Sequence, residues 1–324
     1  MGTTNGKPPL RTDGGLSVSG GHRRRPLLPP RPPLVDLPCS MLVRDLASMG
    51  SNRWRREGSS FLLHGPLGSR AVVSGPEASG VVETLRSSGP KALQVFTALV
   101  ELWSLDTGGE DPEAPASRSV SELAAWMDGG GGAAPARERA RVAEAVGALA
   151  RTRFLEGPPS LRAGHPPGPP VEIQSQSPDD HNGPLVFRPG PGWVRDFRGR
   201  THRVAKLPRG FLSMHARNQR YQILLSFYLS IMLRVNRKHG FFYAVNLRTL
   251  LEGAGIPIPA RNVSRFISAI YGALAEVPGV RCKAPRFSWY SAEELLAAKL
   301  AFWLDHDMTL AYRPSANGGL QRAF

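Results

Sequence analysis

Four groups of residues in this 324-residue sequence have the side chains or spacing of reactive or ligand-binding sites. The first is Asp305, His306 and Asp307, which together offer carboxylate and imidazole ligands for a divalent cation. Adjacent residues of a helix or strand point in different directions, so three consecutive ligands do not converge on one ion. We therefore interpret this group as a surface charge cluster.

The second group invites comparison with a tyrosine recombinase, because His215 and Arg217 have the order His-x-Arg and Tyr221 follows six residues after the histidine. Such an enzyme needs arginine, lysine and nucleophile from separate segments, and here they fall together at a long amphipathic helix. The eight histidines include no His-x-His or His-Glu-x-x-His, so the sequence supports neither a nickase metal site nor a zinc protease.

The two remaining groups are glycine-rich. Residues 65–70 resemble a phosphate-binding loop but lack its lysine, which would reach the phosphate oxygens. The four glycines at 129–132 could offer backbone N–H groups to a phosphate, yet no strand precedes them, so we interpret them as a flexible turn. We expect a protein that is not an enzyme and that needs neither metal nor other cofactor.

The charge of the chain points to a polyanionic partner. There are 41 basic and 26 acidic residues, a formal net charge of +15. The excess is uneven, because residues 90–160 carry 7 basic and 10 acidic side chains whereas 210–280 carry 8 and 2. The second of these segments is also among the most apolar, so its charge belongs to a folded unit. This combination favours a binding face for nucleic acid.

Cysteine usage and hydropathy predict the compartment. The two cysteines, Cys39 and Cys282, lie far apart and show no metal-ligand spacing, so we expect a reducing, cytoplasmic setting. No apolar run reaches 18 residues, and the start of the chain has polar, Gly and Pro residues where a signal peptide would be apolar. We expect neither export nor a membrane partner.

Residues 1–58 are rich in Pro, Gly, Ser and Arg, and we predict a disordered basic arm with one short apolar stretch at 34–46. The basic run at 22–25 precedes several prolines, which favour an extended chain. We interpret the arm as a solvated tail, with contact to phosphates as the alternative.

Three helices are predicted in the next segment. An amphipathic helix begins at Pro90. A short helix at 119–127 begins with a capping box formed by Ser119 and Glu122. The third helix spans 135–153 and carries Arg137, Arg139 and Arg141 near its N-terminal end. Beyond it, apolar segments at 154–157, 171–173 and 185–187 predict the strands and wing of a winged helix over 59–205, with a long Pro-rich insertion.

The second half repeats this plan. Helices are predicted at 220–238, 247–252 and 261–276, with a strand at 241–245 and with Asn246 and Asn262 as N-caps. Gly-Ala-Leu-Ala occurs in both third helices, at 147–150 and 272–275. We therefore predict a mainly α protein with small β wings, of class α+β. It has two tandem winged-helix (helix-turn-helix) domains after the arm, the second over 206–324 with a C-terminal helix.

Three segments carry a family resemblance. They are Leu-Pro-Arg-Gly-Phe at 207–211, residues 219–226 and residues 245–251, followed by the basic helix from Arg261. They resemble the second winged helix of plasmid replication initiators of the tandem winged-helix type, and the layout of 90–290 is similar as a whole. The resemblance implies binding to repeated origin DNA, a dimer that can dissociate, and contacts with host replication proteins, without a catalytic centre.

The predicted partner is therefore double-stranded DNA, and the predicted role is plasmid replication initiation. A winged-helix transcription regulator is the main alternative, and a protein-binding use of winged helices is a third. Recognition helices read bases from their N-terminal half. Residues 90–160 of the first domain carry three more acidic than basic side chains, so we expect the second domain to supply most contacts. The DNA-binding candidates are Arg261, Asn262, Ser264, Arg265, Ser268 and Arg248, with Arg137, Arg139 and Arg141 from the first domain. The competing interpretation of Arg261 and Arg265 is an ordinary solvated stripe.

Overall fold

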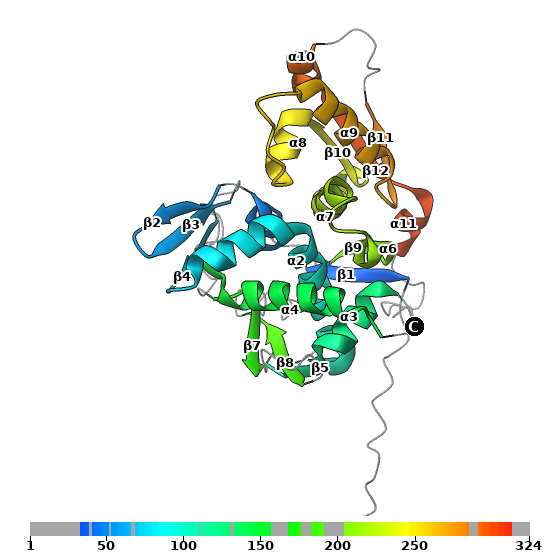
Figure 1. Cartoon of the computed structure of the whole chain (residues 1–324). Coiled ribbons are helices and arrows are strands. Elements are labelled where there is room, and N and C mark those ends of the chain that lie inside the picture. Colours follow the sequence, from blue (N-terminus) through cyan, green and yellow to red (C-terminus); the bar gives the residue numbers. More distant parts are fainter. Residues whose placement is uncertain are drawn as a thin grey trace, which may run out of the picture.

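The computed structural model describes residues 33–38, 41–51, 53–65, 69–109, 111, 113–129, 133–156, 168–175, 183–190, 204–284 and 291–312. It combines helices with small antiparallel sheets, which agrees with the predicted α+β class. Figure 1 shows two bodies stacked on each other, with α7 where they meet. We call residues 55–189 the N-terminal unit, residues 204–312 the C-terminal unit and residues 34–50 the bridging segment.

The N-terminal unit contains three helices and seven strands among its described residues. They are β2 (Arg55–Glu57), β3 (Ser60–His64), β4 (Arg70–Ser74), α2 (Ala78–Thr107), β5 (Ala116–Ser119), α3 (Val120–Asp128), α4 (Ala136–Arg151), β6 (Arg153–Glu156), β7 (Val171–Ser175) and β8 (Pro184–Pro189). One sheet has the strand order β2-β3-β4-β6 and the other β5-β8-β7. All strand pairs are antiparallel.

The C-terminal unit begins with a strand that leads into its helices. Its elements are β9 (Val204–Pro208), α6 (Gly210–Ser213), α7 (Arg220–Val235), η3 (Asn236–His239), β10 (Phe242–Asn246), α8 (Leu247–Gly253), α9 (Val263–Ala275), β11 (Val280–Lys283), α10 (Ala292–Ala297), β12 (Lys299–Leu304) and α11 (His306–Ala311). Its sheet has the order β10-β12-β11. The predicted helices and the predicted strand of this half are confirmed to within a few residues.

The two units share one succession of elements. In each, a long helix is followed by a strand, two helices and two further strands, namely α2-β5-α3-α4-β7-β8 and α7-β10-α8-α9-β11-β12. The last strand lies in the middle of the sheet in both, between the first and the second. The C-terminal unit inserts α10 before its last strand, and the N-terminal unit inserts β6 before β7.

The helix α2 is longer than predicted. It starts at Ala78 instead of Pro90, and its backbone leaves helical geometry at Ser88, with φ −113° and ψ 15°. Proline has no N–H and its ring crowds the preceding turn, which explains a kink just before Pro90. Pro90 thus begins the straight second part of a kinked helix.

Local signals placed α3 and α4 correctly. The Ser119 hydroxyl accepts a hydrogen bond from the Glu122 N–H at 3.1 Å, and the Glu122 carboxylate accepts one from the Ser119 N–H at 2.7 Å. This confirms the predicted capping box. Gly129 ends α3 in the left-handed conformation, with φ 71°.

One predicted wing strand belongs elsewhere. We expected residues 154–157 to form the wing together with the strands near 171 and 185. The strand β6 instead pairs with β4 and closes the sheet β2-β3-β4-β6. Strands β7 and β8 do pair with each other, and their third partner is β5. The prediction failed because β4 and β6 are about 80 residues apart in the sequence. No local pattern shows which distant strand a segment will pair with.

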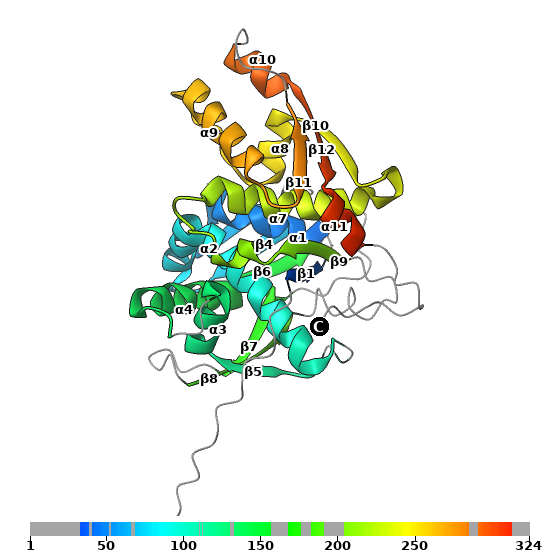
Figure 2. The same cartoon turned by 90° about the vertical axis from the view of Figure 1, so that its right-hand side faces the viewer.

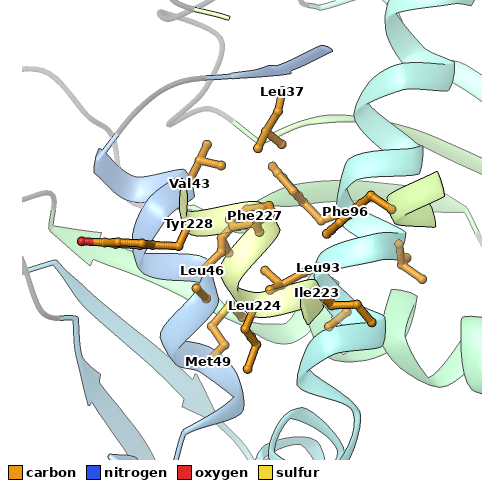
Figure 3. Close-up of a cluster of buried hydrophobic side chains, with 14 of the residues drawn as sticks. Leu37, Val43, Leu46, Met49, Leu93, Phe96, Ile223, Leu224, Phe227 and Tyr228 are labelled. Atoms are coloured by element: carbon orange, nitrogen blue, oxygen red, sulfur yellow. The ribbon is translucent and has the colours of Figure 1, made fainter. Parts of the chain in front are cut away.

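The bridging segment corrects the expectation of disorder over 1–58. Strand β1 (Leu34–Pro38) pairs antiparallel with β9, and α1 (Met41–Leu46) and η1 (Ala47–Gly50) follow it. Val35, Leu37 and Val43 have no exposed surface. Figure 3 shows apolar side chains from this segment meeting Leu93 and Phe96 of α2 and Ile223 and Phe227 of α7. The composition predicted disorder because ordering such a chain costs conformational entropy. Burial of these apolar side chains against both units offsets that cost.

Candidate nucleic-acid interface

Helix α9 is held in place by one apolar face. Phe266, Ile267, Ile270 and Leu274 are buried, at the helical spacing of one, three and four residues. Tyr221 of α7 meets the Phe266 ring edge-on at 5.7 Å between centroids. At the other end, the Gln222 side-chain amide donates to the Glu276 carbonyl at 2.7 Å. Both ends of α9 are therefore fixed to α7.

The opposite face of α9 is polar and positively charged. All five candidates at its N-terminal end are exposed: Arg261, Asn262, Ser264, Arg265 and Ser268. Neither arginine has an ion-pair partner in the part of the chain that the structure describes. The α9 sequence contains no acidic residue, and Glu276 is the first after it. This face therefore presents two guanidinium groups to a partner.

Asn262 stands at the N-cap position but does not cap the helix with its side chain. Its backbone is left-handed, with φ 57° and ψ 35°, and its carbonyl accepts from the Phe266 N–H at 3.0 Å. Asparagine tolerates this conformation better than most residues. Our expectation of a side-chain cap was wrong, and the exposed amide is available for a base edge. The Ser268 hydroxyl is more constrained, because it donates to the Ser264 carbonyl at 3.1 Å.

Arg248 lies on α8 and is partly neutralised. Its Nη2 is 2.7 Å from the Glu293 Oε2 on α10, and both side chains are exposed. An exposed pair of this kind contributes little to stability. No local sequence pattern indicates this pairing, since the two residues are 45 positions apart.

The three arginines of α4 do not form one surface cluster. Arg137 is exposed, whereas Arg139 is half-buried and donates to the Ala134 carbonyl at 3.2 Å. Arg141 lies 3.7 Å from Glu138, which also pairs with Lys91 at 2.5 Å. The exposed stripe of α4 also carries Glu144. The exposed face of α4 is thus less positively charged than that of α9.

The two third helices lie on one side of the molecule. In Figure 2, α4 and α9 both lie toward the left, α4 in the lower body and α9 in the upper body. Figure 1 shows both in front of the sheets of their units. A single extended partner could therefore contact both helices from one side.

A buried polar cluster joins the units behind these helices. Arg209, just before α6, places Nη1 2.7 Å from the Glu101 Oε1 of α2. The Trp126 indole of α3 donates to the Glu101 Oε2 at 2.7 Å, and the Arg209 guanidinium lies 4.4 Å from the Trp126 ring centroid. Burial raises the pKa of Glu101, and Arg209 opposes that rise. Arg209 belongs to the segment 207–211, but no sequence pattern indicated that it pairs with a buried carboxylate.

A second buried side chain reinforces this junction. The Gln94 amide of α2 donates to the carbonyls of Phe211 and Met214, at 2.7 and 2.9 Å. Phe211 lies in α6 and Met214 directly follows it, on the path of the chain toward α7. The position of the C-terminal unit is therefore specified by hydrogen bonds as well as by apolar packing.

Comparisons with protein-family models, with characterised proteins and with solved structures found no match. Among the described residues, no cluster of three His, Cys, Asp or Glu side chains could hold a metal ion. No described helix combines the length and apolar character needed to cross a bilayer.

Proposed function

We propose that this protein binds double-stranded DNA through two winged-helix domains in tandem. The observation that carries the proposal is the repeated succession of elements with one sheet order in both units. A helix, a strand, two helices and a two-stranded wing is the plan of a winged helix, in which the third helix is the recognition helix. That helix is α4 in the N-terminal unit and α9 in the C-terminal unit.

Helix α9 is the proposed reader of the major groove. Arg261 and Arg265 are exposed at its N-terminal half, where recognition helices contact bases and phosphates. Asn262 adds an amide that is not used for capping, and amides of this kind recognise adenine. Helix α4 then contributes through Arg137 and helps to place the protein along the duplex.

The proposed biological role is replication initiation at repeated plasmid origin sites, in the cytoplasm. Two DNA-binding units in one chain suit direct repeats, because each unit can read its own groove segment. The resemblance of residues 207–211, 219–226 and 245–251 to replication initiators supports the same role, with self-association and host replication proteins as further partners. A transcription regulator would use the same interface, and a single palindrome beside the gene would favour it.

The test begins with selection of bound sequences from a random duplex library by the full-length protein. Affinity for the selected duplex is then measured by gel shift for Arg265→Ala and for Arg56→Ala, an exposed arginine of β2 in the other unit. We expect Arg265→Ala to cost about 1–3 kcal/mol and to relax sequence preference at one position. Enrichment of no sequence, or equal effects of both variants, would contradict the proposal.

A further inference from the structure

The sheet β10-β12-β11 has an outer face that the proposed duplex interface does not use. Exposure alternates along β12, where Leu300, Phe302 and Leu304 are buried and the residues between them are not. Side chains of a strand alternate between the two faces, and directly paired residues share a face. The outer face therefore carries Phe242 and Trp303 side by side, since these residues are paired in the register.

Both aromatic side chains of this pair reach solvent. Phe242 is 47% exposed, and Trp303 is partly exposed although large apolar side chains on β12's other face are buried. Adjacent exposed aromatic side chains offer apolar area that a partner could cover. Two adjacent aromatic rings on a sheet face form a platform on which flat groups can stack.

Cations surround the aromatic pair. Arg281 of β11 is paired with Trp303 and continues the same row, and Lys283 is paired with Ala301 in the next row. Lys299 is paired with Asn246 one row further. All three are exposed, and none has an ion-pair partner among the residues that the structure describes. The nearest acidic side chain along β12, Asp305, accepts a hydrogen bond from the Met308 N–H at the start of α11.

The equivalent sheet of the N-terminal unit lacks this composition. On its outer face, Arg188 pairs with Glu172 at 2.6 Å and with Glu113, and Val186 occupies the middle strand. The described residues of that face include no aromatic side chain. The stacking platform is therefore a property of the C-terminal unit and does not follow from the shared fold.

We propose that the outer face of β10-β12-β11 binds single-stranded DNA, with bases stacked on Phe242 and Trp303 and phosphates beside Arg281, Lys283 and Lys299. Aromatic rings next to cations match the two repeating groups of an unpaired strand. A duplex does not fit this surface, because stacking between neighbouring base pairs hides the faces of its bases. The inference rests on the proposed function, which makes DNA the nucleic acid, and it gives the protein a second DNA-binding site, for an unpaired strand.

The test measures binding of the full-length protein to fluorescent (dT)20 and to the selected duplex. Phe242→Ala should weaken (dT)20 binding about 5- to 150-fold, the range for loss of one stacked base. Leu105→Ala removes a side chain of similar exposure, 41%, from α2 and should change neither affinity. Both variants should bind the duplex within twofold of the wild type.

Charge variants supply an independent measurement. Arg281→Gln should reduce the slope of log affinity against log salt concentration for (dT)20 by somewhat less than one, since one phosphate contact is lost. Arg153→Gln on β6 should leave this slope unchanged. Thermal unfolding of each variant shows that the fold is retained. Unchanged (dT)20 binding by both Phe242→Ala and Arg281→Gln would overturn the inference.

Other occupants give different results, and each would also overturn it. If a second copy covers this face, Phe242→Ala will abolish self-association in sedimentation without changing (dT)20 binding. If the partner is RNA, (rU)20 will bind more tightly than (dT)20 and will respond to Phe242→Ala. Failure of the proposed function alone gives a result different from all of these. The wild type would then bind (dT)20 in a Phe242-dependent manner, but the library would yield no duplex that it binds.

Discussion

The guanidinium of Arg209 and the carboxylate of Glu101 form a buried ion pair, with Nη1 and Oε1 2.7 Å apart, between the C-terminal and N-terminal units. The Glu101 side chain is only 4% exposed, and the Trp126 indole donates to its second oxygen. A buried charge without a partner is costly, so this pair ties the entry of the C-terminal unit to α2 and α3. The relative placement of α4 and α9 then depends on a contact that belongs to neither helix.

Removal of Arg209 should destabilise the protein in a pH-dependent manner. Arg209→Gln leaves the Glu101 carboxylate buried without its cation, and we expect a loss of about 3 kcal/mol in the free energy of unfolding at pH 7. The pKa of Glu101 is already raised from 4.5 by burial and should rise further without Arg209. Protonation then removes the unpaired charge, so the loss should shrink as the pH falls toward 5. Urea unfolding at several pH values measures it.

The control for this prediction is the double variant Glu101→Gln, Arg209→Gln, which removes both charges. It should be more stable than Arg209→Gln at pH 7, and the difference between the two should disappear at acidic pH. A destabilisation by Arg209→Gln that is independent of pH would show that lost packing on Trp126 outweighs the lost charge.

The close approach of Gly89 and Gly50 gives a prediction about the bridging segment. A Cβ at Gly89 would lie 2.6 Å from the Gly50 Cα, so α2 and η1 can pack only because both residues are glycine. Gly89→Ala should cost about 1–3 kcal/mol by forcing the backbones apart. Gly80→Ala, in the same helix with no atom within 4 Å of its Cβ, should be neutral or stabilising by up to about 1 kcal/mol. Thermal unfolding of both variants tests this, and equal effects would contradict it.

The sequence predicted those elements whose signals are local. The capping box of Ser119 and Glu122, the left-handed stop at Gly129 and the apolar face of α9 each occupy a few neighbouring residues. The exposed arginines of α9 were likewise predicted from one helix alone. Such features need no knowledge of distant partners.

What the sequence did not reveal depends on distant partners. Strand β1 is ordered because it pairs with β9, 170 residues away, and β6 joins β4 instead of the wing. Three of the candidate arginines are likewise occupied by other groups of the protein. Arg139 donates to a backbone carbonyl, Arg141 lies beside Glu138, and Arg248 pairs with Glu293. The aromatic platform escaped detection because Phe242 and Trp303 meet only through strand register.

The two helices that we propose as recognition helices, α4 and α9, should contribute unequally to duplex binding. Arg137 is the exposed cation at the start of α4, whose exposed stripe includes Glu144, whereas α9 presents Arg261 and Arg265 with no acid in the helix. Arg137→Ala should therefore weaken binding of the selected duplex less than Arg265→Ala, which we expect to cost about 1–3 kcal/mol. Gel shifts under one salt condition compare them. A larger effect of Arg137→Ala would reverse the ranking of the units.

Duplex binding should depend strongly on salt and need neither nucleotide nor metal. Residues 161–324 carry 22 of the 41 basic side chains, enough for about six to ten phosphate contacts. Each contact releases condensed counterions, so affinity should fall by about 10³–10⁵ between 50 and 200 mM salt. The logarithmic slope measured by fluorescence anisotropy counts the contacts, and addition of EDTA should leave it unchanged. A shallow slope would limit the interface to a few phosphates. Affinity that is insensitive to salt but abolished by a chelator would instead require a metal-dependent site, and the proposal that exposed arginines of α9 hold the duplex would be wrong.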